Sequence, residues 1–262
     1  MNPALLLIAD SRLPAGGHAH SGGVERAVAS GAVHDVPSLD RFLRGRLHTS
    51  GTLAAALTAA AALQASGTPT RPAPGTARPD AGATRPAAGT AQSAGGADES
   101  PWVRLDEEVD ARTASPAQRD ASRTQGRLLL RVARRVWPSN VLNDLAQAVP
   151  HPHHPIALGV AAHAAGAAPE EAAMAAAYHA VSGPATAAVR LLGLDPVAVH
   201  ALLAAFTPDL TAVAAQGHFA ATNAHPAPQL APQWEALPAY SAPALDLLAE
   251  QHAQAEVRLF VS

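Results

Sequence analysis

Alanine is the feature of this sequence that most restricts its fold. Hydrophobic residues make up 48% of the 262 positions, but more than half of them are alanine and aromatic residues account for only 3%. Alanine is the strongest helix former and has a small side chain, so alanine-rich helices can pack closely. No run alternates β-branched and polar residues with the period of a strand. We therefore expect an all-α fold, a single domain resembling a helical bundle.

Charge and cysteine content exclude several classes of function. The formal net charge is −3 and every basic residue is arginine, with neither half of the chain basic enough to indicate nucleic-acid binding. The absence of cysteine excludes disulfides, thiolate metal ligands and cysteine nucleophiles. The longest uncharged apolar stretches are shorter than the ~20 residues of a membrane-spanning helix. We expect a cytoplasmic protein that binds neither nucleic acid nor a membrane.

Two helical blocks flank a low-complexity segment. Residues Ala65–Ser100 are rich in Pro, Gly, Ala, Thr and Ser and show no apolar periodicity. Such a segment cannot bury enough surface to offset the entropy lost on ordering, so we expect a disordered linker. Residues 1–64 and 101–262 are then two parts of the same helical domain.

Capping patterns predict where the helices begin and end. Ser115-Pro116-Ala117-Gln118 combines a capping box with proline at the first helical position. Ser38 is expected to open a helix that continues to Leu63, and the last helix is expected to span Ala242–Leu259. Further helix starts are expected at Pro169, Asp195-Pro196 and Thr207-Pro208, and helix stops at Gly166, Gly193 and Gly217.

The run from Ala9 to Glu25 is unusually rich in glycine. Its glycines do not follow the order of a Walker phosphate loop, and the chain contains no lysine, so nucleotide binding of that kind is excluded. Glycines between two short helices favour a tight backbone turn instead. We expect Ser21 and Glu25 to cap or hold this turn.

Two groups of histidines have the spacing of metal ligands. They are His18 with His20, and His151 with His153 and His154. Imidazole suits nickel and zinc, but neither group has a third ligand fixed by the sequence. We expect surface or packing roles for them and keep metal contact as the alternative. No serine lies in a nucleophile elbow, so we expect no catalytic residue and no cofactor.

Four arginines follow one face of the helix expected after Ser115. They recur at helical spacing, at Arg123, Arg127, Arg131 and Arg134. Such a face is either solvated, or binds an acidic partner, or binds the more acidic C-terminal half of the same chain. The sequence leaves these three alternatives open.

Four motifs occur in order along the chain. The first, within Leu6–Leu47, is Ser11-x-x-Pro14-x-Gly16-Gly17 with His20-Ser21-Gly22-x-x-Glu25; the second is Leu105-Asp106 and Arg112-Thr113 with Ser122-x-x-x-Gly126-Arg127; the third is His154-Pro155-x-x-x-Gly159; the fourth is Arg258-Leu259-Phe260 before Ser262. Together they resemble the UreF family of urease accessory proteins. The chain departs from the family pattern at His18, Gly23 and Val261, where an aromatic residue, leucine and arginine are common.

The resemblance implies a non-catalytic, all-helical protein that forms a homodimer in a complex. It would sit between the accessory protein UreD, also called UreH, and the GTPase UreG on apo-urease, helping nickel incorporation and regulating GTP hydrolysis. The alternative, motivated by the 13 histidines, is a histidine-based nickel-binding metallochaperone. The candidate partner-binding residues are His20, Ser21, Glu25, Arg190, Arg258, Leu259 and Phe260.

Arg190 is the only basic residue between Arg135 and Arg258. Three roles are open to it: an ion pair with Glu170 or Glu171, a contact with the partner GTPase, or an arginine finger that reaches the phosphates. A side chain carried on a helix has little reach, which argues against the finger.

Overall fold

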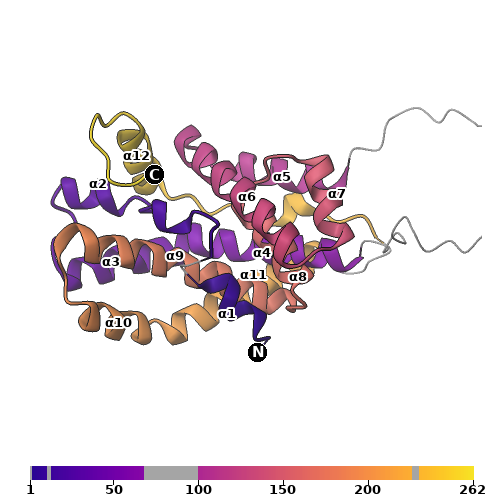
Figure 1. The fold of residues 1–262 in the computed structure, drawn as a ribbon, viewed down its shortest axis with the longest axis horizontal. Coiled ribbons are helices and arrows are strands. Elements are labelled where there is room, and N and C mark those ends of the chain that lie inside the picture. The colour runs from indigo at the N-terminus through magenta and orange to yellow at the C-terminus, as the bar shows by residue number, and fades with distance from the viewer. Residues whose placement is uncertain (1, 11–12, 68–99, 226–229) are drawn as a thin grey trace, which may run out of the picture.

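The chain folds into packed α-helices (Figure 1). The computed structural model describes residues 2–10, 13–67, 100–225 and 230–262, and in these ranges it contains no strand, which confirms the all-α prediction. The helices are α1 Ala4–Ala9, α2 Val24–Ala29, α3 Val36–Arg46, α4 Thr52–Gly67, α5 Pro101–Arg112, α6 Pro116–Val136, α7 Asn140–Ala148, α8 His154–Ala164, α9 Pro169–Leu192, α10 Pro196–Ala205, α11 Thr207–Ala224 and α12 Pro243–Ala253. Within those ranges no single helix has both the length and the apolarity to cross a membrane; only α10 and α11, bent by 48° where they meet, pass together.

The helix α4 forms the centre of the core. It packs against α8, α9 and α11, which are also rich in alanine. Ala55, Ala59 and Ala60 of α4 are fully buried. Because methyl groups separate two helices less than leucine side chains do, the helix backbones come close together. The core therefore rests on many small contacts at high packing density rather than on a few large side chains.

Gly217 shows how close this packing is and corrects one expected helix stop. It lies inside α11, which continues to Ala224. A Cβ atom at Gly217 would lie 2.8 Å from the carbonyl carbon of Ala55 and 2.8 Å from the amide nitrogen of Ala56. Glycine is required here by contact with α4. Gly193, in contrast, ends α9 with a φ of 64°, as expected.

The expected caps at Ser115 and Asp195 are confirmed, whereas Thr207 is the first residue of α11 and does not cap it. Two expected boundaries are also wrong. Ser115 Oγ accepts a hydrogen bond from the Gln118 N–H at 3.1 Å and caps α6. The helix expected to open at Ser38 begins earlier, because Asp35 accepts the Ser38 N–H at 2.8 Å and is the cap of α3. The last helix ends at Ala253, so the residues after it form an irregular tail.

A π-helical turn, Leu47–Gly51, interrupts the helix expected from Ser38 to Leu63. Arg46 lies just before this turn and donates hydrogen bonds to the carbonyl oxygens of Ala180 at 3.0 Å and Gly22 at 2.9 Å. Burial lowers the pKa of Arg46 to about 10. This arginine joins α3 to α9 and to the turn that precedes α2.

Both boundaries of the expected linker are also corrected. Ala65 is buried in α4, which continues to Gly67. Ser100 accepts a hydrogen bond from the Trp102 N–H at 3.4 Å and caps α5. The remainder of the expected linker, residues 68–99, lies outside the described residues.

Replacing Gly217 by alanine should lower the free energy of unfolding by about 1–3 kcal/mol, the usual cost of overpacking a core. The matched control is Gly45→Ala in α3, where an added Cβ would meet nothing within 4 Å. This control should be neutral or stabilising by about 0.5–1 kcal/mol, since alanine favours the helix over glycine. Urea denaturation measures both. Equal effects of the two substitutions would contradict the close approach of α11 to α4.

Candidate partner-binding face

Three segments that are distant in sequence meet in the structure. They are residues His20–Glu25, the C-terminal end of α9, and the tail after α12. In Figure 1 the C-terminus lies beside α12 and near α2. All seven candidate partner-binding residues lie on these segments, although nothing in the sequence pattern placed the segments together.

The turn before α2 needs glycine. Gly22 has a φ of 59°, and a Cβ atom there would lie 3.0 Å from Pro184 Cγ and 3.1 Å from Arg46 Cζ. The preceding Ser21 is fully buried, and its Oγ accepts the Glu25 N–H at 3.5 Å. The expectation that Ser21 and Glu25 hold this turn agrees with these contacts. Ser11 of the first motif and the side chain of His18 lie outside the described residues.

Glu25 binds the backbone of the tail. Its carboxylate accepts the N–H groups of Leu259 at 2.7 Å and Phe260 at 3.2 Å. Two more backbone bonds extend the contact, from the Val261 N–H to the Ala19 carbonyl at 2.7 Å and from the Ser21 N–H to the Ser262 carbonyl at 2.5 Å. The side chains of His20 and Ser262 also meet, with Nδ1 and Oγ 2.6 Å apart. The tail is therefore fixed along the N-terminal turn.

The helix before the tail is anchored on α6. Glu250 of α12 accepts hydrogen bonds from Ser115 Oγ at 2.5 Å and from the Ala117 N–H at 3.0 Å. These bonds, the one from Ser115 first, lower the pKa of Glu250. A carboxylate at the N-terminal end of α6 also interacts favourably with that helix's dipole. Because these bonds hold α12 against α6, they also fix the position at which the tail begins.

Arg190 contacts the tail and not the acids proposed for it. Glu170 and Glu171 lie in the first turn of α9 and Arg190 in the last, about 30 Å away along the helix. The alternative of an ion pair with Glu170 or Glu171 is therefore wrong. The Arg190 guanidinium lies over the ring of Phe260, with Cζ 4.9 Å from the ring centroid, a cation–π contact.

The tail presents some of its candidate residues to solvent and buries others. Phe260 is only 6% exposed, whereas Leu259 is 72% exposed and Arg258 is also exposed. Val257 and Val261, on either side, are exposed as well. The outer surface of the tail is therefore apolar with one arginine, and Phe260 fixes it from beneath.

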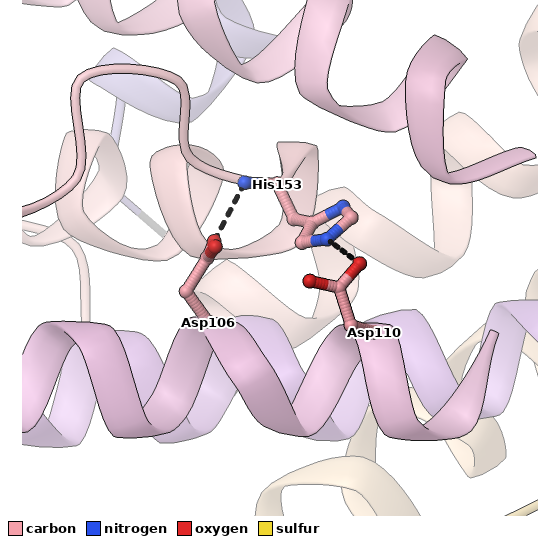
Figure 2. Close-up of side chains that lie close together, drawn as sticks. All are labelled: Asp106, Asp110 and His153. Atoms are coloured by element: carbon pink, nitrogen blue, oxygen red, sulfur yellow. Dashed lines mark hydrogen bonds and ion pairs between the residues drawn. The ribbon is translucent and has the colours of Figure 1, made fainter. Parts of the chain in front are cut away.

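A second group of polar residues joins α5, α6 and the loop before α8. Asp106 and Asp110 lie one turn apart on α5 and point toward His153 (Figure 2). Asp106 accepts the backbone N–H of His153 at 2.8 Å, and Asp110 lies 2.9 Å from its Nε2. Arg123 of α6 binds both carboxylates, at 2.8 Å and 2.5 Å. Arg123 therefore fits none of the three alternatives for the basic face, because it pairs with acids of α5. Arg127 of the same face is exposed.

These residues are of types that bind metal ions, but the Arg123 guanidinium already pairs with both carboxylates. Burial would raise the pKa of Asp110, but hydrogen bonds from His153 and Arg123, together with the charge of Arg123, outweigh it and lower the pKa. Burial lowers the pKa of His153, so its imidazole is neutral and donates from Nε2 to Asp110. Arg123 supplies the positive charge that the two carboxylates require. The arrangement is an ion-pair network that fixes the loop before α8 against two helices.

The structure separates the three histidines that the sequence grouped before α8. His151 is exposed, His153 belongs to the ion-pair network, and His154 begins α8, where its backbone N–H donates to Ser122 Oγ at 3.1 Å. The loop lies so close to α6 that a Cβ atom on Gly126 would be 2.0 Å from the Pro152 carbonyl oxygen. Sequence spacing could not show this division, because it depends on contacts with α5 and α6.

Comparison with known proteins identifies the family. The UreF family model matches residues 33–207, more than half of the chain. The chain belongs to the UreF family. Similar proteins named urease accessory protein UreF occur in Mycolicibacterium vanbaalenii, 41% identical over 258 residues, in Mycobacterium sp. strain JLS, 40% over 261 residues, and in Mycobacterium tuberculosis, 36% over 258 residues. Each alignment covers 98% of this chain and 97% of the relative. UreF membership confirms the resemblance seen in the four motifs.

Replacing Arg123 by alanine should lower the free energy of unfolding of this UreF-family protein by about 3 kcal/mol. The substitution leaves two carboxylates close together, and the Asp106 side chain is only 6% exposed. Arg127→Ala on the same helix is the control and should change stability by less than about 0.5 kcal/mol, because Arg127 is exposed. Both are measured by urea denaturation at pH 7. A loss of similar size for both variants would show that the network is not stabilising.

Proposed function

We propose that this chain is a non-catalytic scaffold of urease maturation in the cytoplasm. It joins a UreD/UreH-type accessory protein to a UreG-type GTPase on apo-urease, as part of a homodimer, and regulates GTP hydrolysis during nickel incorporation. Membership of the UreF family supports the role in urease maturation. The observation that carries the more specific proposal is the meeting of His20–Glu25, Arg190 and the tail on one face.

The outer side of the tail is the surface that we assign to the UreD/UreH-type partner. Leu259 and its apolar neighbours are exposed around Arg258, and such a patch is stabilised when a partner covers it. Phe260 is buried against Arg190, so its side chain could enter a partner's pocket only if the tail left this position. We therefore assign direct contact to Leu259 and Arg258 and an orienting role to Phe260.

The buried members of the candidate set support this surface from within. Ser21 is fully buried and His20 is 7% exposed, so neither offers much area to a partner. The Glu25 carboxylate accepts hydrogen bonds from two backbone N–H groups of the tail. We assign these three residues the task of holding the tail in one conformation, which reduces the entropy lost when a partner binds.

Arg190 is the residue that we assign to the GTPase interface. It is exposed at the C-terminal end of α9, and its contact with Phe260 fixes its guanidinium beside the tail. Extending it into a nucleotide site would break this cation–π contact, worth about 0.5–1 kcal/mol at an exposed site. We favour an interface contact over an arginine finger for this reason.

Replacing Leu259 by alanine should weaken binding of the purified UreD/UreH-type partner by about tenfold, or about 1.4 kcal/mol. Arg258→Ala should weaken it less, since it lies at the edge of the apolar surface. Phe219→Ala is the control, because Phe219 is an equally exposed large apolar residue, 67% exposed, on α11. Surface plasmon resonance measures the affinities, and circular dichroism should be unchanged. Unaltered binding by Leu259→Ala would exclude the tail as the partner surface.

Replacing Arg190 by alanine should reduce assembly with the UreG-type GTPase, measured by size-exclusion chromatography with GTP turnover recorded in parallel. Arg190→Lys should partly restore assembly, because lysine keeps the charge but not the planar stacking group. Arg135→Ala, another exposed arginine, is the control and should assemble normally. Normal assembly with lost stimulation of turnover would instead indicate a finger. If neither quantity changes, Arg190 has only its structural contact with Phe260.

A further inference from the structure

Three arginines form a ridge along the outer face of α6. Arg127, Arg131 and Arg134 follow one another at intervals of four and three residues, which places them on one side of the helix over about 10 Å. All three are exposed, whereas Leu129 and Val132 on the opposite side of the helix are buried, where α6 packs against α8. We call these three residues the arginine ridge.

The ridge forms no ion pair with any described part of the chain. The arginines whose ion pairs the structure describes are Arg44, Arg112, Arg119 and Arg123. Arg134 instead donates a hydrogen bond to the amide oxygen Oδ1 of Asn143 at 2.9 Å. All acidic residues of the C-terminal half lie within the described ranges, so the ridge does not bind that half of the same chain.

Nothing in α6 itself balances the charge of the ridge. From Ala121 to Val136 the helix contains no acidic residue. Like charges three or four residues apart on a helix repel each other and lower its stability. The negative end of the helix dipole offsets this repulsion for Arg134 in the last turn, but Arg127 and Arg131 lie before that turn. A solvated face gains nothing from this arrangement, because charges of mixed sign keep a helix soluble equally well.

The charge of the whole chain indicates which anion the ridge fits. A guanidinium group pairs with a carboxylate or a phosphate through two parallel hydrogen bonds. The net charge of −3 and the sequence pI of about 6.5 oppose the approach of a polyanion, whereas a nucleic-acid-binding domain has a pI above about 9. A protein segment with a few carboxylates at helical spacing matches the length and the charge of the ridge. It does so without the charge density of a nucleic acid.

We propose that the arginine ridge is a docking surface for an acidic segment of a partner protein. The segment carries carboxylates spaced like those at positions i, i+4 and i+7 of a helix. Arg127 lies about 18 Å along α6 from Ser115, where Glu250 anchors α12, so the ridge is separate from the tail surface. The inference rests on the proposed function in one respect, since the proteins of urease maturation supply the partner.

The first test uses the full chain alone, with fluorescently labelled poly-L-glutamate as the probe and anisotropy as the measurement. The parent chain should bind the probe at low salt. Arg127→Gln with Arg131→Gln should weaken binding by about tenfold, because each exposed arginine–carboxylate pair changes affinity only a few-fold. Glutamine is as good a helix former as arginine, and circular dichroism should show an unchanged fold.

The matched control is Arg41→Gln with Arg104→Gln, which removes two exposed arginines from α3 and α5 and gives the same net charge. This control should bind poly-L-glutamate within about twofold of the parent chain, because its arginines do not lie on one ridge. The proposal is overturned if the control loses as much affinity as the ridge variant, or if the ridge variant binds like the parent. Tighter binding of a DNA duplex than of poly-L-glutamate would overturn the assignment to a protein partner.

The second test measures association with the purified UreD/UreH-type protein, UreG-type GTPase and apo-urease by surface plasmon resonance. For one of these proteins the ridge variant should associate about tenfold more slowly than the parent at low salt, with a smaller change in dissociation. The difference should shrink in about 1 M NaCl, where the Debye length falls to about 3 Å. Unchanged association with all three proteins would overturn the ridge as a docking surface.

The two tests separate this inference from the proposed function. If the parent chain binds none of the three proteins, the scaffold function is overturned, and the poly-L-glutamate measurement still decides whether the ridge binds carboxylates. If the parent assembles normally and the ridge variant does so too, only the ridge is overturned.

Discussion

Close contact between alanine-rich helices is the interaction on which the rest of this structure depends. Small residues on α4, α8, α9 and α11 let the helix backbones approach until a single added carbon at Gly217 would collide with α4. Dispersion contacts of this kind are individually weak and numerous, and they vanish quickly with distance. The long helix α9 packs against α4, α8 and α11 through such contacts. Its last turn consequently carries Arg190 to a fixed position beside the tail.

The functional face is built on this core from parts that have little stability of their own. The turn His20–Gly23, the short helix α2 and the irregular tail bury few apolar side chains, and each relies on contacts with the others. Glu25 and Arg46 provide the links, one to the tail backbone and one to α9. A surface assembled in this way can be well ordered and still respond to a partner, because its bonds are few and near solvent.

Local features were predictable from the sequence and contacts between distant segments were not. Ser115 caps α6 as expected, because a cap is decided within four residues. The sequence predicts a helix stop at Gly217, because a glycine that is required by a turn cannot be told in the sequence from one that is required by close contact with a neighbouring helix. Six of the seven candidate residues of the face belong to the four motifs and Arg190 stands out as an isolated basic residue, but their meeting depends on the return of the tail to α2. The pairing of Arg123 with Asp106 likewise required the fold.

The π-helical turn at Leu47–Gly51 has a consequence for changes of chain length. A π turn closes its hydrogen-bonded ring with one residue more than an α turn, and each helical residue rotates the chain by about 100°. Deleting one residue there would allow an unbroken α-helix, with helix content and composition almost unaltered. It would also rotate Arg46 by about 100° relative to α4 and carry its guanidinium away from the carbonyl oxygens of Gly22 and Ala180. The number of residues in this segment therefore matters to the structure as much as the identity of the side chains that the segment positions.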